Sequence, residues 1–471
     1  MITKSPITIL FLIITAMLMQ GCIEDGVDTS PSSQPLFSTE TVDLGTVFTG
    51  ERTPTMRLMV YNSHDKVMNI SDISLRGGDD CFRINVDGMA GREFKDVEIR
   101  PKDSIYIFVD ALLPEMGRPT PVERIGHIDF VTNGVTASVK LQAVGQDVVR
   151  LRGKSFDADT RLDNTYPYQI FDSLIVGKDV TLTIPKGAKL HFHDRSYMRV
   201  YGTLVTEGTS DTPVDLCGDR MGNVVGEIPF DLMASQWQGL EFAAGSRDNN
   251  LSHTFVRNTV GGVVANRGTD IRFLNCRLRN SARYPLSSAH ADIRLIGCEI
   301  ADGGEGVMKL TGGNVVANHC TFANYYLFSP IRGAMVQFEH YDVASSDGSG
   351  LPVLSADFSN CIFYGLGTEL SVKSFASDNT VGDSEKGVYL RHCLFGSNGS
   401  DDANFIDCVW GMDPLYGTVR DEYLFDYRLR PGSPAINAAD PALTHPDAAT
   451  DIYGIHRLPT PNLGAYQSVC D

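Results

Sequence analysis

The chain has 471 residues, with 58 acidic against 40 basic side chains, ten cysteines and a net charge of −18. This length exceeds that of an ordinary compact domain, so we expect several domains or one long repeat structure. The charge argues against DNA or RNA as a partner, since phosphate backbones are bound through clustered lysine and arginine, and a hydrophobic content of 42% excludes wholesale disorder.

Residues 1–21 are predicted to be a signal peptide. Lys4 precedes an apolar run from Ile7 to Met19, which is shorter than the roughly 20 residues that a membrane-spanning helix needs. The run ends in Met19-Gln20-Gly21-Cys22, which resembles the lipobox of bacterial lipoproteins. The resemblance implies that Cys22 is diacylated and becomes the new N-terminus. The alternative is an ordinary cleaved signal followed by an incidental cysteine.

Residues 22–36 are predicted to be an acidic tether rich in serine and proline. Ile23-Glu24-Asp25 resembles the export signal of Gram-negative bacteria that display lipoproteins outward, and a plain solvated linker is the alternative. The resemblance implies a surface lipoprotein of the outer membrane that faces the cell exterior. Its membrane contact is the lipid on Cys22, because two acyl chains suffice for stable anchoring.

Residues 37–146 alternate apolar and polar side chains over short runs, which predicts an antiparallel β-sandwich. Clear examples are Met56–Val60, Ser104–Val109 and Ala137–Leu141. The segment resembles the immunoglobulin-like modules of bacterial surface proteins, and we expect a spacer or interaction module without chemistry of its own. The motifs that carry the resemblance are Val42-Asp43-Leu44-Gly45, Val60-Tyr61-Asn62, Ile99-Arg100-Pro101 and Ala143-Val144-Gly145. Residues 147–167 are predicted to be a polar connector.

Residues 168–404 carry an internal period of 22 residues, the most specific pattern in the chain. We expect the first two recurring columns to point inward and the third to occupy left-handed turns, which Asn and Asp tolerate. Such columns predict a parallel β-helix with one coil per 22 residues. The columns are Thr254, Cys276, Cys298 and Cys320; Val256, Leu278, Ile300 and Phe322; and Asn258, Asn280, Asp302 and Asn324.

The columns continue at Cys361 and Cys393 after insertions, which we expect to leave the coils as loops near Tyr341–Gly350 and Ser374–Lys386. Insertions between constant coils are where repeat proteins build binding surfaces. The repeated cysteines are predicted to be small core residues, because in-register neighbours have parallel Cα–Cβ vectors that suit a disulfide poorly.

Both ends of the repeat resemble known β-helix proteins. Val180–Ala188 is similar to the opening coils of right-handed β-helices of the pectate-lyase-like superfamily. Asp413–Tyr416, Tyr427–Ala435 and Asn462–Tyr466 resemble the carboxyl-terminal cap called the choice-of-anchor Q domain. These resemblances imply a right-handed solenoid whose residues 405–471 cap its open end.

The motifs of the active superfamily members are missing, so no catalytic residue is predicted. The chain has no Arg-x-Pro-x-x-Arg, Asn-Thr-Asp or Gly-His-Gly segment. His191 and His193 share one strand face, but a third ligand is absent nearby in the sequence, so we predict neither a metal nor another cofactor.

Aromatic residues near predicted loops are candidate ligand or partner contacts, with core packing as the alternative. We therefore expect a non-catalytic surface protein that binds a glycan, another cell or an outer-membrane protein. The alternative is a polysaccharide lyase or hydrolase of the pectate-lyase-like class. The candidate contacts are Trp237, Tyr325, Tyr326, Tyr341 and Asp342.

Overall fold

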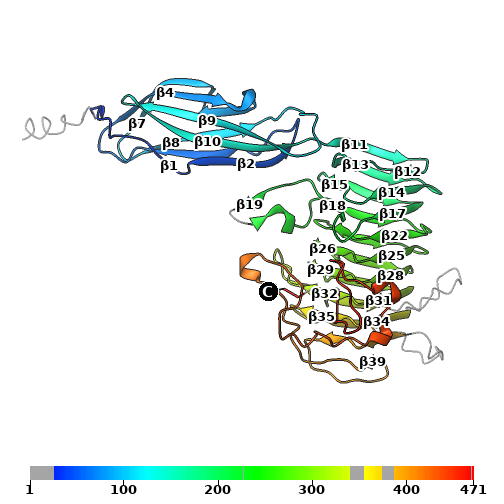
Figure 1. The fold of residues 1–471 in the computed structure, drawn as a ribbon. Coiled ribbons are helices and arrows are strands. Elements are labelled where there is room, and N and C mark those ends of the chain that lie inside the picture. The colour runs from blue at the N-terminus through cyan, green and yellow to red at the C-terminus, as the bar shows by residue number, and fades with distance from the viewer. Residues whose placement is uncertain (1–25, 226–227, 340–354, 374–386, 468, 471) are drawn as a thin grey trace, which may run out of the picture. The chain divides into compact units, whose positions relative to one another are not determined.

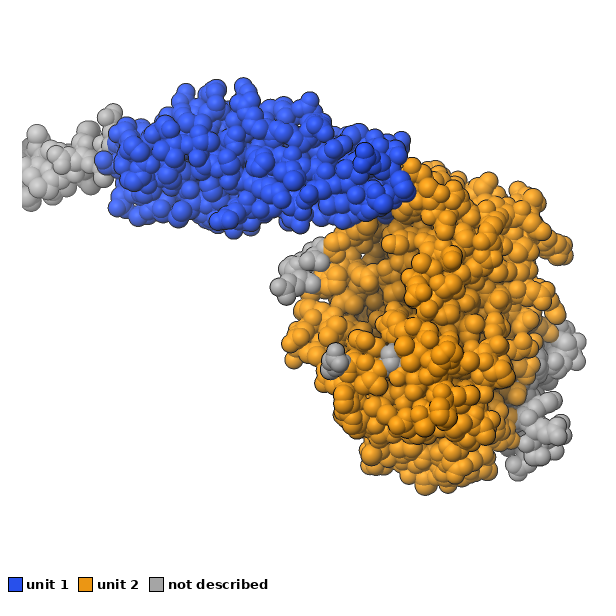
Figure 2. Space-filling view, viewed as in Figure 1, with its two compact units in different colours: residues 1–147 blue, residues 148–471 orange. Residues whose placement is uncertain are grey.

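The computed structural model describes residues 26–225, 228–339, 355–373, 387–467 and 469–470. Cys22, Tyr341, Asp342 and the whole of both predicted insertion loops lie outside these residues. The described chain is all-β, with strands and a few short 3-10 turns (Figure 1). It divides into two compact units, Met1–Asp147 and Val148–Asp471 (Figure 2).

Unit 1 consists of two five-stranded sheets around one apolar core. Alternation in β8 (Ser104–Ala111) is confirmed, because Ile105, Ile107 and Val109 are buried while Tyr106 and Phe108 are exposed. One pair departs from the expected antiparallel pattern, since β2 (Thr41–Phe48) and β10 (Val135–Gln146) run parallel. The sheets are β1 (Leu36–Phe37), β3 (Met56–Tyr61), β8 (Ser104–Ala111), β5 (Phe82–Val86) and β6 (Met89–Gly91); and β2 (Thr41–Phe48), β10 (Val135–Gln146), β9 (Val122–Thr132), β4 (Met68–Gly77) and β7 (Glu93–Ile99).

Unit 2 is built on large parallel sheets, one of 17 strands and one of ten. Each repeat in the middle of the unit adds one strand to each of three rows. The strands of the 17-stranded sheet are β11 (Val149–Phe156), β13 (Tyr168–Val176), β15 (Lys189–Phe192), β16 (Tyr197–Val200), β18 (Val214–Gly218), β21 (Gly239–Phe242), β23 (Thr254–Val256), β24 (Val263–Ala265), β26 (Arg277–Ser281), β27 (Leu286–Ala289), β29 (Glu299–Gly303), β30 (Met308–Thr311), β32 (Thr321–Asn324), β33 (Val336–Glu339), β35 (Ile362–Gly365), β36 (Leu370–Lys373) and β38 (Leu394–Phe395). This sheet contains the first row, which includes β23, β26, β29, β32, β35 and β38, and the second row, which includes β24, β27, β30, β33 and β36.

The ten-stranded sheet forms the third row, and a short hairpin, β19 (Asn223–Val225) with β20 (Ile228–Pro229), projects between β18 and β21. The ten strands are β12 (Thr160–Arg161), β14 (Thr181–Pro185), β17 (Thr203–Glu207), β22 (Asn249–Ser252), β25 (Asp270–Leu274), β28 (Asp292–Ile296), β31 (Asn314–Asn318), β34 (Ser355–Ser359), β37 (Val388–Arg391) and β39 (Phe405–Ile406).

Strand register confirms the predicted columns. Leu278 pairs with Ile300, and Ile300 with Phe322, one repeat apart. The column then passes both insertions unbroken, because Phe322 pairs with Phe363, and Phe363 with Phe395. The stacked rings of these phenylalanines lie 4.8 and 5.2 Å apart, so burial and aromatic contact reinforce the same register.

The repeated cysteines are buried free thiols, as predicted. Each Sγ lies within hydrogen-bond distance of the carbonyl two residues before it, as Cys298 does with Ile296 at 3.4 Å. The residue between them has a positive φ, for example 64° at Gly297, and this turn aims the carbonyl back at the thiol. The third column follows the prediction at Asn258, Asn280 and Asp302 but not at Asn324, whose φ is not positive.

Two segments differ from the expected organisation. Residues 147–167 are not only a connector, because β11 and β12 lie in this stretch and pair with β13 and β14 of unit 2.

The segment predicted to be a cap, residues 405–471, has two parts that contact different regions of unit 2. Phe405 and Trp410 pack against Phe395 near the last coil, with Trp410 stacked on Phe395 at 4.6 Å.

The rest of the C-terminal segment packs along the side of the parallel strands rather than over the last of them. Apolar side chains of this segment pack on outward residues of the first row, where the strands carry alanine, isoleucine or leucine. The shared cluster contains Ala301, Ala323, Ile362 and Leu394 from the coils and Tyr416, Tyr427, Leu429, Leu463 and Tyr466 from the segment.

Candidate functional site

Trp237 belongs to the core, so the sequence prediction of a ligand contact there was wrong. Its ring is fully buried and stacks on Phe192 at 4.0 Å. The indole Nε1 donates to the backbone oxygen of Arg257 at 2.7 Å. Because both the ring face and the indole N–H of Trp237 already contact other residues of the protein, neither is available to a ligand.

Tyr325 and Tyr326 lie together in a small depression on unit 2, which we call the aromatic depression. Its volume is about 10 Å³, enough for roughly one water molecule, so a ligand would lie across it rather than inside it. Phe328 is 39% exposed and meets the Tyr326 ring edge-on at 5.9 Å. The lining residues are Leu232, Asn280, Asp302, Tyr325, Tyr326, Leu327, Phe328 and Phe425.

Asp302 is the acidic residue of this depression. Its Oδ1 accepts hydrogen bonds from the hydroxyl of Tyr427 at 2.6 Å and from the backbone N–H of Tyr325 at 3.0 Å. Its Oδ2 is buried and has no hydrogen-bond partner among the residues that the structure describes. Burial raises the pKa of Asp302 to about 6, so near neutral pH this carboxyl can exchange a proton as well as accept hydrogen bonds.

A second carboxylate, Glu299, lies on the same strand but is fully engaged. Its Oε1 accepts from Arg279, with Nε at 2.6 Å, and its Oε2 accepts from the hydroxyl of Tyr466. Glu299 is completely buried and does not line the depression. Acid–base hydrolysis of a glycosidic bond ordinarily needs two carboxyl groups facing the substrate, and here one of the two is committed to an ion pair.

His191 and His193 contact different side chains. His191 lies against Cys217, with Nδ1 and Sγ 3.4 Å apart, and burial lowers its pKa. His193 instead contacts Asp219, with Nδ1 and Oδ2 2.7 Å apart. Within the described ranges, no group of three or more His, Cys, Asp or Glu side chains is placed to hold a metal ion.

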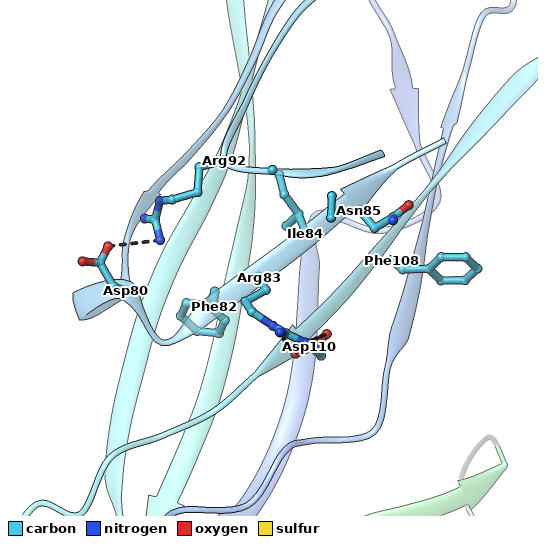
Figure 3. A pocket seen from close by; sticks show the side chains of 10 residues that line it. Asp80, Phe82, Arg83, Ile84, Asn85, Arg92, Phe108 and Asp110 are labelled. Atoms are coloured by element: carbon cyan, nitrogen blue, oxygen red, sulfur yellow. Dashed lines mark hydrogen bonds and ion pairs between the residues drawn. The ribbon is translucent and has the colours of Figure 1, made fainter. Parts of the chain in front are cut away.

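Unit 1 contains a larger hollow of about 580 Å³ beside β5, β6 and β8 (Figure 3). Arg83 and Asp110 face each other in it, with two hydrogen bonds of 3.0 and 3.1 Å, and Asp80 reaches Arg92 at 3.0 Å. Because these two acidic and two basic side chains form ion pairs with one another, a partner in the hollow would meet mainly apolar surface and no unpaired charge from them.

Sequence reasoning identified Tyr325 and Tyr326 but missed Asp302, Asn280 and Phe425 as their neighbours. Asp302 and Asn280 were noted only as turn residues, although their column places them in successive coils. Phe425 comes from the C-terminal segment, whose path no local pattern reveals. In the part of the chain with assigned structure, no helix is long and apolar enough to span a bilayer.

No family model and no curated protein matches the chain. A family 123 glycoside hydrolase from Clostridium perfringens is 8% identical over 24% of this chain and 25% of that one, with a TM-score of 0.18. The periplasmic chaperone SfaE is 12% identical over 24% and 56%, with a TM-score of 0.18. The catalytic domain of a GH87 alpha-1,3-glucanase is 10% identical over 68% and 92%, with a TM-score of 0.13. The chain spans about a quarter of the first hydrolase, and these TM-scores support no inference about fold or activity.

Proposed function

We propose that the protein is a lipid-anchored surface lipoprotein whose second unit is a non-catalytic platform for binding a glycan. In this proposal Cys22 carries the lipid, unit 1 is an immunoglobulin-like spacer, and unit 2 is a right-handed parallel β-helix. The three-row parallel register of unit 2 and its 22-residue spacing support the β-helix. Two five-stranded sheets around one core support the sandwich.

The aromatic depression is the observation that carries the binding function. Aromatic rings stack on the apolar faces of sugars, and Phe328 and Tyr325 remain partly exposed for this contact. The Oδ2 of Asp302 is buried beneath them without a partner in the described structure, and the depression has room for about one water molecule that would bridge it to a sugar hydroxyl. A depression too small to enclose a ligand suits one sugar of a chain lying across the surface.

A glycan panel tests the binding function. The full-length protein in detergent should retain at least one polysaccharide, and Phe328→Ala should weaken that binding by roughly 0.5–1.5 kcal/mol, about 2- to 12-fold. Tyr201→Ala, which removes an exposed ring on an early coil, should leave it unchanged. Retention that ignores Phe328→Ala would contradict the proposed site.

The same panel decides the alternative function. The raised pKa of Asp302 favours a general acid, which is what a polysaccharide lyase or hydrolase would require. Release of unsaturated or reducing ends that is lost in Asp302→Asn would establish that activity and overturn the non-catalytic proposal. The engagement of Glu299 with Arg279 is why we prefer binding.

The lipid anchor has its own test. Cys22→Ala should abolish labelling with a fatty-acid probe and release the protein into the soluble fraction. Protease added to intact cells should degrade the wild-type protein if it faces the exterior. A Cys22→Ala protein that stays labelled and membrane-bound would refute the anchor.

A further inference from the structure

Unit 2 has a second pocket, of about 140 Å³, that shares no lining residue with the aromatic depression. The bend before β26 and the strand itself supply Asn275 and Arg277, and β23 supplies Phe255. The turn after β17 supplies Ser210, and the C-terminal segment closes the pocket with Tyr453. The volume lies below the roughly 300 Å³ of drug-sized sites, so the pocket suits one small molecule or one residue of a chain.

Arg277 forms no ion pair in the described structure, because the carboxylate of Glu299, its register partner on β29, is bound by Arg279 and Tyr466 instead. Its guanidinium makes no hydrogen bond or ion pair with any residue that the structure describes, and its Nε is buried without an acceptor. The neighbouring arginines behave differently, because Arg257 pairs with Asp215 and Asp231, and Arg279 with Glu299. The side chain of Arg277 stays partly exposed at the pocket, so its unused N–H groups can donate hydrogen bonds to a partner that comes from outside.

The groups around Arg277 narrow the chemistry of that partner. The guanidinium lies 4.9 Å from the centre of the Tyr453 ring and 5.8 Å from that of Phe255, so aromatic faces flank it. Asn275 Nδ2 lies 3.3 Å from His253 Nε2, which leaves Asn275 Oδ1 as a buried acceptor with no donor in the described structure. The pocket therefore offers a cationic donor and a neutral acceptor close together.

Gly297 leaves room for this acceptor. It occupies the same place as Asn275 one coil further along, and a Cβ there would lie 2.2 Å from Asn275 Oδ1. Any larger side chain at 297 would therefore displace the Asn275 amide. The absence of a side chain at this position fits an acceptor that has to stay in place.

We propose that this pocket binds a carboxylate that carries a neighbouring hydroxyl group. The carboxylate accepts hydrogen bonds from Arg277, whose planar fork matches its two oxygens. The hydroxyl donates to Asn275 Oδ1, and the apolar face of the ligand packs on Tyr453. Free hydroxy acids and acidic sugar residues share this chemistry. The inference is independent of glycan binding at the aromatic depression.

Calorimetric titration of the full-length protein in detergent tests the inference. D-glucuronate should bind at least tenfold more tightly than D-glucose, which has a hydroxymethyl group in place of the carboxylate. It should also bind more tightly than inorganic phosphate, which has no carbon frame that carries hydroxyl groups. Arg277→Gln should weaken glucuronate binding at least tenfold, and Arg277→Lys less. Arg267→Gln, which alters an exposed arginine elsewhere on the coils, should have no effect.

A second comparison separates the two sources of the ligand. Tighter binding of a glucuronate-terminated oligosaccharide than of gluconate supports a glycan source, and the reverse order supports a free hydroxy acid. Equal binding of glucose, binding unaffected by Arg277→Gln, or no saturable binding of either carboxylate would overturn the proposal. Gly297→Asn adds a readout within the pocket, because asparagine tolerates the positive φ of 64° at this position while its Cβ displaces the Asn275 amide. This variant should weaken glucuronate binding without removing the charge of Arg277.

Discussion

The hydroxyl of Tyr427 donates a hydrogen bond to Oδ1 of Asp302 across 2.6 Å, although 125 residues separate them in the chain. Both side chains are buried, and the contact joins the C-terminal segment to β29. Tyr466 makes a parallel connection to Glu299 on the same strand. The C-terminal segment is thus held to the coils by polar contacts set within an apolar cluster.

Tyr427→Phe should lower the free energy of unfolding by removing one hydrogen bond, while the ring continues to fill the core between the C-terminal segment and β29. The ring volume stays, but Asp302 Oδ1 loses a donor in a buried site, which costs about 1–3 kcal/mol in the free energy of unfolding. The same loss should raise the pKa of Asp302 further, because the hydroxyl of Tyr427 lowers it. Urea unfolding would measure the first effect. An unchanged free energy would show that the contact contributes nothing.

The raised pKa of Asp302 makes stability depend on pH in a defined window. The pKa rises from 3.8 to about 6 on folding, so the folded protein holds this proton more tightly than the unfolded chain. The associated stability is present below about pH 4 and is lost as pH rises to about 6, a change of about 3 kcal/mol. Subtracting the unfolding free energies of Asp302→Asn from those of wild type between pH 4 and 7 isolates it. Parallel curves would contradict the assignment.

Replacing one of the repeated core cysteines by serine should cost less free energy of unfolding than truncating a neighbouring core phenylalanine. Thr254 already occupies the first position of the column, and its hydroxyl donates to Ser252 O at 3.0 Å, so a serine at 298 should find the carbonyl of Ile296. We expect Cys298→Ser to cost about 1 kcal/mol, against about 3–5 kcal/mol for Phe322→Ala, which opens a cavity in the stack.

Thiol titration checks the same core cysteines. The protein unfolded without reductant should expose the thiols of Cys276, Cys298, Cys320, Cys361 and Cys393 as reactive groups. A count lowered by two or more disulfides among these five cysteines would contradict the argument from parallel Cα–Cβ vectors.

The parallel strands of unit 2 could be predicted because the same residue types recur at a fixed spacing in the sequence. In-register columns such as Leu278, Ile300 and Phe322 recur at a constant spacing, so each copy reinforces the prediction. The candidate site was only half predictable. Tyr325 and Tyr326 follow a column residue directly, whereas their contacts with Phe425 and Tyr427 depend on a segment that returns after about a hundred residues. No local pattern encodes such a return, and nothing in the sequence distinguishes the unpaired Arg277 from the paired Arg279.

Those two arginines provide the last prediction, because they lie two residues apart on β26 and differ in their partners. Arg279→Met leaves the buried carboxylate of Glu299 without its cation and should cost about 3–5 kcal/mol. Arg277→Met leaves Glu299 its hydrogen bonds from Arg279 and Tyr466 and keeps an apolar stem between Phe255 and Tyr453. The losses are cation–π contacts of about 0.5–1 kcal/mol each and a weak attraction to Glu299, and they are offset because the variant no longer buries part of a guanidinium. We expect its unfolding free energy to stay within about 1 kcal/mol of wild type. Urea unfolding of both variants measures the contrast, and equal losses would show that Arg277 has a structural partner and is not held for a ligand.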